Sequence, residues 1–444
     1  MLSSVARLAG HKGEVLCLDA SCGDGSSSGI SSGIRSSSSS SSSSSRDPVL
    51  ASGGEDGTVR LWDLQAGRAS RAIMLPAADG DGSDNAVNAV CLGLSGASEH
   101  WVYAATGATV CGYDLRAPGM LLREPTRRFT PSRDEIGQLA LHESGALAAA
   151  DDAGEVRVYD VAGGAGDLLA TLAGGHSSLC GCAAFRPGRP WELYSAGLDA
   201  VCVRWDWKAA ASMASWPLAR LFAIDEKAQL LNPRHAHCLS FAPDGGTFAL
   251  ALGDGSVEVR LAESGEPLAA VDAHRAAASQ ARFSPQLRAA LLEHARTEIA
   301  SVASASTSAQ AAVSLDAAAA CEGLASGSAL PLLSTGDDRQ LRLWSVEGAS
   351  GRGADGGRDG DGGTARSKRQ RSTVAGAEGA SRMDDDDDDD DDQTAGAAEP
   401  GFRALAAVTL PEKPNWVAGV SDASSQRAVV CVATTGALID VLRM

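Results

Sequence analysis

The 444-residue sequence predicts an all-β fold made of repeated small antiparallel sheets. Three observations lead to this prediction: one 15-residue unit recurs along the chain, apolar and polar residues alternate inside each copy, and turns rich in Asp and Gly separate the alternating segments. Alternation with a period of two is typical of half-buried strands, and turns of the Asp-Gly type are typical of hairpins. The 50 glycines suit a chain of short strands and tight turns.

The clearest copy of the unit is LASGGEDGTVRLWDL at residues 50–64. Each copy has a strand of small residues, a turn, and a second strand that ends in an aromatic residue and often Asp. Internal similarity of this kind indicates a repeat architecture. The other copies lie at residues 102–116, 147–161, 193–207, 250–264 and 332–346.

A further short strand precedes each copy, so six sheets can be counted directly. These preceding strands are expected at residues 15–18, 89–92, 138–141, 182–185, 238–241 and 280–283. A seventh sheet follows from the segments 415–420, 428–434 and 438–442, which supply three strands.

These units, together with the loop sequences FRPGRP, FAPDGG and FSPQL, resemble the WD-repeat family. Members of this family fold as β-propellers, in which four-stranded blades are arranged radially. The resemblance implies one seven-bladed β-propeller spanning residues 1–444, closed by its N- and C-terminal strands. The missing strand of the seventh blade is then expected at residues 5–8, where closure removes the exposed sheet edge that an open array would leave.

The resemblance also assigns a buried polar brace to three blades. Such a group persists in a core only when every member is hydrogen-bonded, and it then fixes the geometry of its blade. A Ser-His-Asp hydrolase triad is the alternative, but a triad needs one exposed copy and this spacing recurs three times. Blades without the brace, with Ala153 at the Asp position or Arg260 at the Trp position, are expected to be less stable. The brace residues are His11, Ser52, Asp56 and Trp62; His176, Ser195, Asp199 and Trp205; and His274, Ser334, Asp338 and Trp344.

Three low-complexity insertions interrupt the repeat. Residues 26–45 form a Ser-rich loop, residues 287–328 are Ala- and Ser-rich, and residues 347–401 are Gly- and Asp-rich. Segments of this composition are expected to be mobile and to lie outside the core. The basic residues Lys368, Arg369 and Arg371 in the third insertion form either a nuclear import signal or a chance basic cluster.

The formal net charge of −18 owes half its value to nine consecutive aspartates at residues 384–392. The rest of the chain is only mildly acidic, which argues against direct nucleic-acid binding. The aspartate run is either a solvated loop or a docking site for a basic partner. No apolar run is long enough to span a bilayer, and residues 1–10 lack the core of a signal peptide, so we expect an intracellular protein of the nucleus, the cytoplasm or both.

The chemistry-bearing residues do not assemble into an active site. The ten cysteines sit mostly in apolar runs, and the pair Cys180 and Cys182 has no matching partner at metal-ligand spacing. No phosphate-binding loop is present, and the histidines are scattered. The sequence therefore predicts a non-enzymatic, monomeric propeller that binds other proteins within a complex, with no cofactor, metal, membrane or small-molecule substrate.

A narrower resemblance connects the chain with the WD repeat-containing protein 53 subfamily. It is strongest at residues 184–210, at QLLNPRHAH (229–237) and at PNWVAG (414–419). The resemblance implies a substrate receptor of cullin-4 RING ubiquitin ligases that docks on the damage-specific DNA-binding protein 1 adaptor. Such receptors carry a W-D-x-R motif, whose Arg presents a fixed fork of donors.

One degenerate copy of this motif exists here, formed by Tyr113, Asp114 and Arg116. Its Arg either docks the adaptor or is merely solvated at a blade edge. The alternative function is a scaffold in another complex, possibly chromatin-associated, that uses the acidic loop to hold basic partners.

Overall fold

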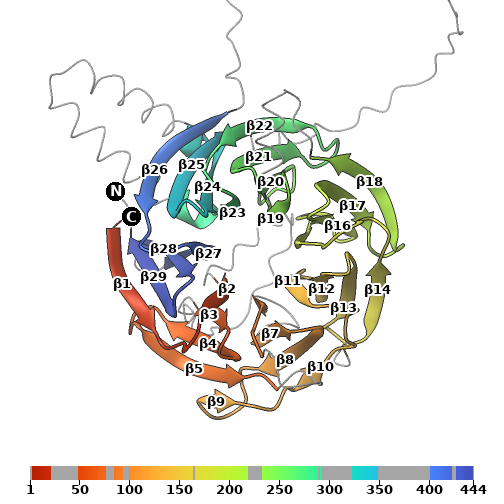
Figure 1. Cartoon of the computed structure of the whole chain (residues 1–444), viewed down its shortest axis with the longest axis vertical. Coiled ribbons are helices and arrows are strands. Elements are labelled where there is room, and N and C mark those ends of the chain that lie inside the picture. The colour runs from red at the N-terminus through yellow and green to blue at the C-terminus, as the bar shows by residue number, and fades with distance from the viewer. Residues whose placement is uncertain are drawn as a thin grey trace, which may run out of the picture. The chain divides into compact units, whose positions relative to one another are not determined.

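The computed structural model describes residues 3–21, 49–76, 85–93, 100–163, 166–218, 233–288, 291–292, 323–348, 401–422 and 427–443. These residues form seven antiparallel sheets, which stand as blades around a central axis (Figure 1). The first strand of each blade lies nearest the axis, and its last strand lies at the rim. The all-β, seven-bladed propeller predicted from the sequence is confirmed.

The blades follow one another in chain order. Blade 1 contains β2 (Val15–Ser21), β3 (Val49–Gly54), β4 (Thr58–Asp63) and β5 (Arg68–Met74), and blade 2 contains β6 (Ala89–Leu92), β7 (Trp101–Thr106), β8 (Thr109–Asp114) and β10 (Arg127–Arg128). Blade 3 contains β11 (Ile136–Leu141), β12 (Ala146–Asp151), β13 (Val156–Asp160) and β14 (Leu168–Leu172), and blade 4 contains β15 (Cys182–Phe185), β16 (Glu192–Ala196), β17 (Val201–Asp206) and β18 (Ala211–Pro217). Blade 5 contains β19 (Ala236–Phe241), β20 (Thr247–Leu252), β21 (Ser256–Leu261) and β22 (Pro267–Asp272), and blade 6 contains β23 (Ala278–Phe283), β24 (Ala329–Gly336), β25 (Gln340–Glu347) and β26 (Phe402–Thr409).

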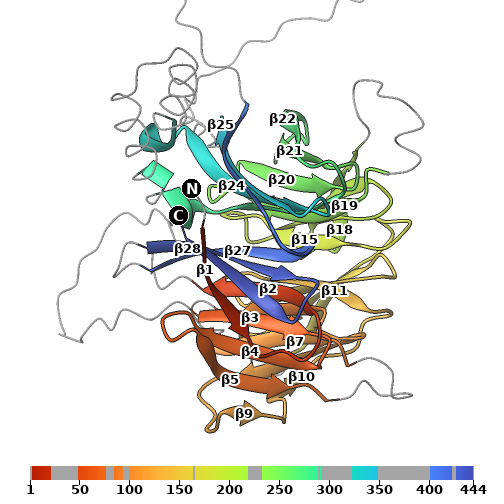
Figure 2. The ribbon, with the colours of Figure 1, turned by 60° about the vertical axis from the view of Figure 1, so that its left-hand side comes forward.

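Blade 7 joins the two ends of the chain. Its strands β27 (Pro414–Asp422), β28 (Arg427–Thr434) and β29 (Leu438–Arg443) are completed by β1 (Ser3–Ala9), which pairs antiparallel with β29. The register places Leu8 opposite Ile439. Figures 1 and 2 show the N and C ends next to each other. The closing strand predicted at residues 5–8 is therefore confirmed.

The hydrophobic core lies between the blades rather than inside any one of them. Every residue of β12 is buried, because this strand is covered on both faces. Leu147 and Ala149 pack toward blade 2, whereas Ala146, Ala148 and Ala150 pack toward blade 4. The period of two thus divides one strand between two interfaces, and small side chains allow the neighbouring blades to approach closely.

The outer strands of blades 1 and 2 depart from the expected pattern. The fourth strand of blade 2, β10, has two residues, and the chain first crosses to blade 1. There β9 (Leu121–Leu122) pairs in parallel with β5, so blade 1 is a five-stranded sheet with β9 at its edge. The sequence analysis did not predict this strand.

The second insertion is anchored in the core at both ends, contrary to the expectation that all of it would lie outside. Leu287, at the end of the 3-10 helix η2 (Pro285–Leu287), is buried together with Leu291 and Leu324 among residues of blades 6 and 7. Arg288 donates from Nε to the Leu324 carbonyl over 2.7 Å, which joins the two ends. Leucines four residues apart fall on one side of a helical turn and bury together. The middle of this insertion, the Ser-rich loop at 26–45 and residues 349–400 lie outside the described residues.

Candidate interaction site

Asp114 and Arg116 form a closed ion pair at the end of β8. Asp114 Oδ1 accepts the backbone N–H of Arg116 and its Nε, both over 2.9 Å, while Oδ2 accepts from Nη2 over 2.7 Å. These bonds from Arg116 are the main reason why the pKa of Asp114 is lowered. The side chain of Arg116 is 63% exposed. A planar guanidinium is thereby held at the surface in one orientation by its own turn.

The aspartate of this motif caps a turn in several blades. Asp63 Oδ1 accepts the backbone N–H of Gln65 over 2.9 Å, and Asp206 Oδ1 accepts that of Lys208 over 3.0 Å. An Asp that bonds the backbone two residues ahead makes an Asx-type turn. The conformation of the turn therefore explains why an Asp stands at this position in blades 1, 2 and 4. Among these blades, only blade 2 has an Arg two residues after the Asp.

Tyr113 takes the place of the motif's Trp and has a structural role. Its ring is buried in the core between blades 1 and 2. Its hydroxyl has no hydrogen-bond partner among the described residues, and burial raises its pKa. Of the three residues predicted to contact the adaptor, Tyr113 is thus inaccessible, while Asp114 orients the exposed Arg116.

In blade 1 the four brace residues meet as one hydrogen-bonded chain. Trp62 donates from Nε1 to Ser52 Oγ over 2.8 Å, and Ser52 Oγ lies 2.7 Å from His11 Nε2. His11 Nδ1 lies 3.0 Å from Asp56 Oδ1. Since a carboxylate only accepts, Nδ1 carries the proton of a neutral His11, and Ser52 donates to Nε2. Each of the side-chain atoms that link these four brace residues thereby has a hydrogen-bond partner.

Blades 4 and 6 repeat this geometry. Trp205 donates to Ser195 over 2.8 Å, with His176 2.7 Å from Ser195 and 3.1 Å from Asp199. Trp344 donates to Ser334 over 2.9 Å, with His274 2.9 Å from Ser334 and 3.0 Å from Asp338. All three serines are 0% exposed, so none presents its hydroxyl to a substrate.

Burial changes the pKa values of two brace histidines. It lowers the pKa of His11 and of His274 against the opposing effect of their aspartates. Burial alone would raise the pKa of Asp56, but hydrogen bonds from Thr58, the Lys12 N–H and His11 lower it. Burial thus favours the neutral form of His11 and His274, while the pKa values of their partners Asp56 and Asp338 are lowered, which favours the ionised carboxylates.

Blade 5 replaces the brace with a buried ion network. Arg260, which stands at the Trp position, lies 2.8 Å from Glu258, and Glu258 also pairs with Arg234. Arg234 lies 2.9 Å from Asp254 and donates to the Leu218 carbonyl over 2.7 Å. Charged groups thus occupy the place of the brace in blade 5, and the lower stability expected for this blade stays a prediction.

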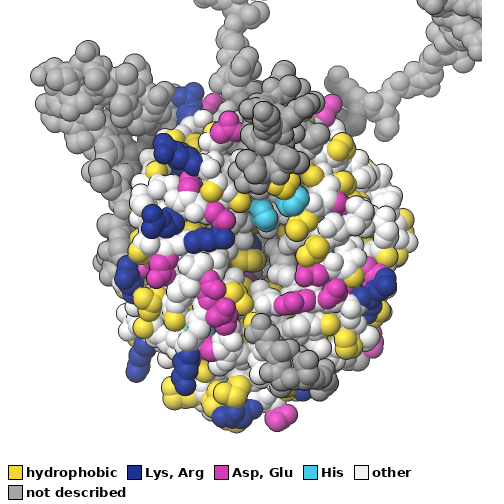
Figure 3. All heavy atoms as spheres, viewed as in Figure 1, with side chains coloured by type: hydrophobic (Ala, Val, Ile, Leu, Met, Phe, Trp, Pro, Cys, Tyr) yellow, Lys and Arg dark blue, Asp and Glu magenta, His cyan; other side chains and the backbone are white. Residues whose placement is uncertain are grey.

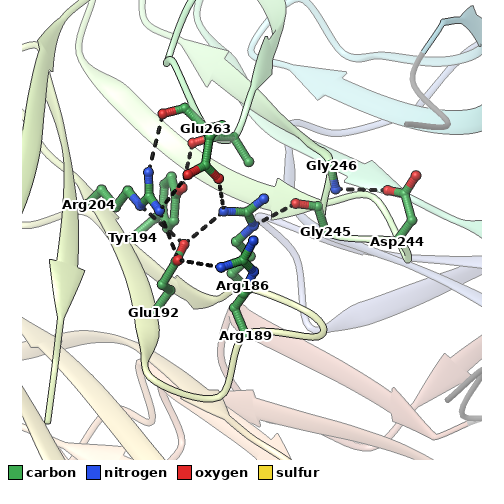
Figure 4. Close-up of polar contacts among 10 residues, drawn as sticks. Arg186, Arg189, Glu192, Tyr194, Arg204, Asp244, Gly245, Gly246 and Glu263 are labelled. Atoms are coloured by element: carbon green, nitrogen blue, oxygen red, sulfur yellow. Dashed lines mark hydrogen bonds and ion pairs between the residues drawn. The ribbon is translucent and has the colours of Figure 1, made fainter. Parts of the chain in front are cut away.

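A second buried ion network joins blade 4 to blade 5 (Figure 4). Glu192 is enclosed by Arg186, 2.9 Å away, and by Arg204. Glu263, from the turn between β21 and β22, reaches across to both arginines over 2.8 and 3.1 Å. This cluster was not predicted, although part of its signal lies in the stretch 184–210, where three arginines accompany a single glutamate.

The remaining predicted features have different outcomes. The eight described cysteines are free and buried, and burial raises the pKa of Cys17, Cys180, Cys202 and Cys431 to about 12. Within the described ranges, no cluster of three His, Cys, Asp or Glu side chains is placed to hold a metal ion, and no helix has the length and apolarity needed to cross a membrane. The basic cluster Lys368, Arg369 and Arg371 and the aspartates at 384–392 lie outside the described residues.

Comparisons with known proteins agree with this architecture. Residues 2–63 match the family model "WD domain, G-beta repeat". The chain is 24% identical over 268 residues to the WD repeat-containing protein 53 homolog of Dictyostelium discoideum. The match includes 57% of the chain, and the chain spans 63% of the length of that relative.

Solved structures share the fold. One is the WD40 β-propeller domain of Doa1, with a TM-score of 0.56, 14% identity, and coverage of 99% of this chain and 96% of that one. Another is a chain in the crystal structure of the mitotic checkpoint complex, with a TM-score of 0.55, 15% identity, and coverage of 90% and 84%. At these identities the likeness concerns the fold alone.

Proposed function

We propose that this chain, which has a β-propeller fold and is similar to WD-repeat proteins, is a protein-binding platform that serves as a substrate receptor of a cullin-4 RING ubiquitin ligase. In this role the propeller docks on the damage-specific DNA-binding protein 1 adaptor through Arg116 and presents a bound client protein to the ligase. The choice of a cullin-4 ligase in this proposal rests on the resemblance to the WD repeat-containing protein 53 subfamily. WD-repeat propellers in general act as interaction scaffolds rather than as catalysts.

The observation that supports docking is the preset geometry of Arg116. Its side chain is exposed, and Asp114 fixes the plane of the guanidinium through Nε and Nη2, which leaves Nη1 directed away from the pair. A guanidinium oriented before binding loses less conformational freedom when it meets carbonyl or carboxylate acceptors on a partner. The turn thus provides the rigid, exposed donor that the motif requires.

Arg116→Ala tests the proposal by pull-down of the purified adaptor. Loss of a charged anchor is expected to weaken binding about tenfold or more. Arg116→Lys is expected to fail as well, because an ammonium cannot reproduce the fork. Lys208→Ala is the matched control, since Lys208 stands at the same turn position in blade 4. Equal recovery of wild type and Arg116→Ala would contradict docking at this site.

The alternative proposal is a scaffold that holds basic partners through the aspartates at 384–392. Nine adjacent carboxylates favour it, because such a run attracts cationic segments in a salt-dependent manner. Affinity purification separates the two proposals: recovery of cullin-4 and its adaptor favours the first, and recovery of histones that is lost when residues 384–392 are deleted favours the second.

We also propose that the protein works in the nucleus, the cytoplasm or both, with Lys368, Arg369 and Arg371 as an import signal. Replacement of all three by Ala in a fluorescent fusion is expected to shift the protein toward the cytoplasm. An unchanged distribution would contradict the import role.

A further inference from the structure

The rim of blades 1 and 2 carries a surface unlike the rest of the propeller. Leu121, on the added strand β9, is 45% exposed, and Met120, just before this strand, is 72% exposed; Met74, at the end of the neighbouring strand β5, is 38% exposed. Arg123 Nη1 lies 2.9 Å from Met74 Sδ, so the ends of the two strands are in contact. We call the surface formed by Met74, Met120 and Leu121, together with the exposed Arg68, Arg123 and Arg128 of the outer segments of blades 1 and 2, the basic–apolar rim.

The basic–apolar rim is positively charged, whereas the protein as a whole is acidic. The protein has a net charge of −18, yet the outer strands of blades 1 and 2 carry Arg68, Arg71, Arg127 and Arg128. The outer strands of blades 3, 4 and 5 carry no Lys or Arg. Arg68, Arg123 and Arg128 form no ion pair with any carboxylate that the structure describes. Figure 3 shows hydrophobic and basic side chains together at the lower edge of the disc, where Figure 1 places β9.

The strand β9 also offers a free sheet edge. It is the outermost strand in the order β2-β3-β4-β5-β9, and its bonds run inward, with Met120 O accepting from the Ala72 N–H over 2.9 Å. An exposed edge strand presents unpaired N–H and C=O groups to which an extended peptide can add. Flexible methionines are common on surfaces that bind peptides.

We propose that the basic–apolar rim binds an extended acidic segment of another protein that carries a large apolar side chain. The acidic groups would meet Arg68, Arg123 and Arg128, and the apolar side chain would rest on Met120 and Leu121. The backbone of the segment would pair with β9. This inference goes beyond the proposed function, and it holds whether or not Arg116 docks an adaptor.

The test uses three fluorescein-labelled twelve-residue peptides and the purified full chain, followed by fluorescence anisotropy. The first peptide is rich in Asp and Glu with two central leucines, the second has serines in place of the leucines, and the third has lysines in place of the acidic residues. The first is expected to bind at least about tenfold more tightly than either of the others, with an affinity that falls as salt rises. Equal binding of the first and second peptides would overturn the apolar part of the proposal.

Two variants locate the binding. Met120→Ser with Leu121→Ser, and separately Arg123→Glu with Arg128→Glu, are each expected to weaken the first peptide about tenfold. Arg123 and Arg128 are exposed, so the second variant still tests the proposal if the first variant alters folding. Leu168→Ser with Leu169→Ser is the control, because these residues are 40% and 49% exposed on β14, a rim strand without arginines.

Three results would overturn the proposal. The first is unchanged binding in both variants, and the second is an equal loss in the control. The third is binding that appears only after residues 384–392 are deleted, because the chain's own aspartates would then be the occupant rather than a partner protein.

Discussion

Arg204 and Glu192 face each other on neighbouring strands of blade 4 and form a two-pronged ion pair. Arg204 donates from Nε to Oε2 over 3.1 Å and from Nη2 to Oε1 over 2.8 Å. Both side chains are buried, and the same carboxylate also accepts from Arg186. A single glutamate therefore pairs with two buried arginines, while Glu263 supplies the second negative charge and connects them to blade 5.

Glu192→Gln is expected to destabilise the protein by roughly 3–5 kcal/mol, because removal of one partner leaves buried charge uncompensated. The amide keeps the volume of the side chain, so packing is not the cause. The free energy of unfolding from urea denaturation measures the loss. Glu263→Gln is the control: most of its side chain is exposed, and a change of about 1 kcal/mol or less is expected. Equal effects of the two changes would contradict the central role of Glu192.

Ser52→Ala tests the brace of blade 1. It removes the atom shared by Trp62 Nε1 and His11 Nε2 and leaves two buried groups without a partner, at a cost of about 1–3 kcal/mol. Thermal melting measures the effect. Ser212→Ala, at an exposed position of β18, is expected to leave the melting temperature unchanged. A neutral Ser52→Ala would mean that the brace contributes no stability.

The histidines of the brace predict a dependence on pH. Burial lowers the pKa of His11 and His274 in the folded state, below the value of about 6.5 expected for the unfolded chain. The unfolded state therefore binds more protons at mildly acidic pH. Stability is fully present above pH 6.5 and falls as the pH drops below it. Urea denaturation at intervals from pH 7 to pH 5 measures this slope.

A double variant isolates this contribution. His11→Gln with His274→Gln is expected to be less stable at pH 7 but to lose less stability on acidification. The lowered pKa values of Asp56 and Asp338 contribute only below about pH 4, outside this window. The same slope in wild type and variant would contradict the assignment.

Local sequence patterns predicted the blades because alternate residues of a strand point to opposite faces of the sheet. In β12 the small residues divide between two interfaces, and the strand could be located from the sequence without knowledge of its neighbours. The resemblance to the WD-repeat family assigned His11, Ser52, Asp56 and Trp62 to a hydrogen-bonded brace, and these four side chains do meet, although 27 residues between β2 and β3 lie outside the described structure.

Contacts between blades could not be predicted in the same way. Glu263 meets Arg186 only because the turn of blade 5 lies against blade 4, and nothing in either segment specifies that approach. The strand β9 was missed for a related reason: Leu121 and Leu122 are too few to give a periodic signal, and their partner β5 belongs to the preceding blade. The ion network around Arg260 could not be predicted either, because Glu258 lies on the same strand but Arg234 comes from the segment before β19.

Closure by β1 predicts that a chain starting at Gly10 is destabilised as a whole. The truncation removes the strand that pairs with β29, exposes the edge of blade 7, and loses Leu8 from the core between blades 7 and 1. Loss of this leucine alone costs about 1.5–3 kcal/mol. Because blade 1 packs on blade 7, the melting temperature of the entire propeller should fall in one transition. Differential scanning calorimetry measures it.

Two further measurements separate closure from the loss of a single side chain. Arg7→Lys keeps the strand and the charge opposite Asp440, and it is expected to melt like the wild type. A synthetic peptide of residues 1–9, added to the truncated chain, is expected to raise the melting temperature progressively, with the logarithm of its concentration, since it binds only the folded ring. If the truncated chain melts at the wild-type temperature, or if the peptide has no effect on a destabilised ring, then β1 does not hold the ring closed.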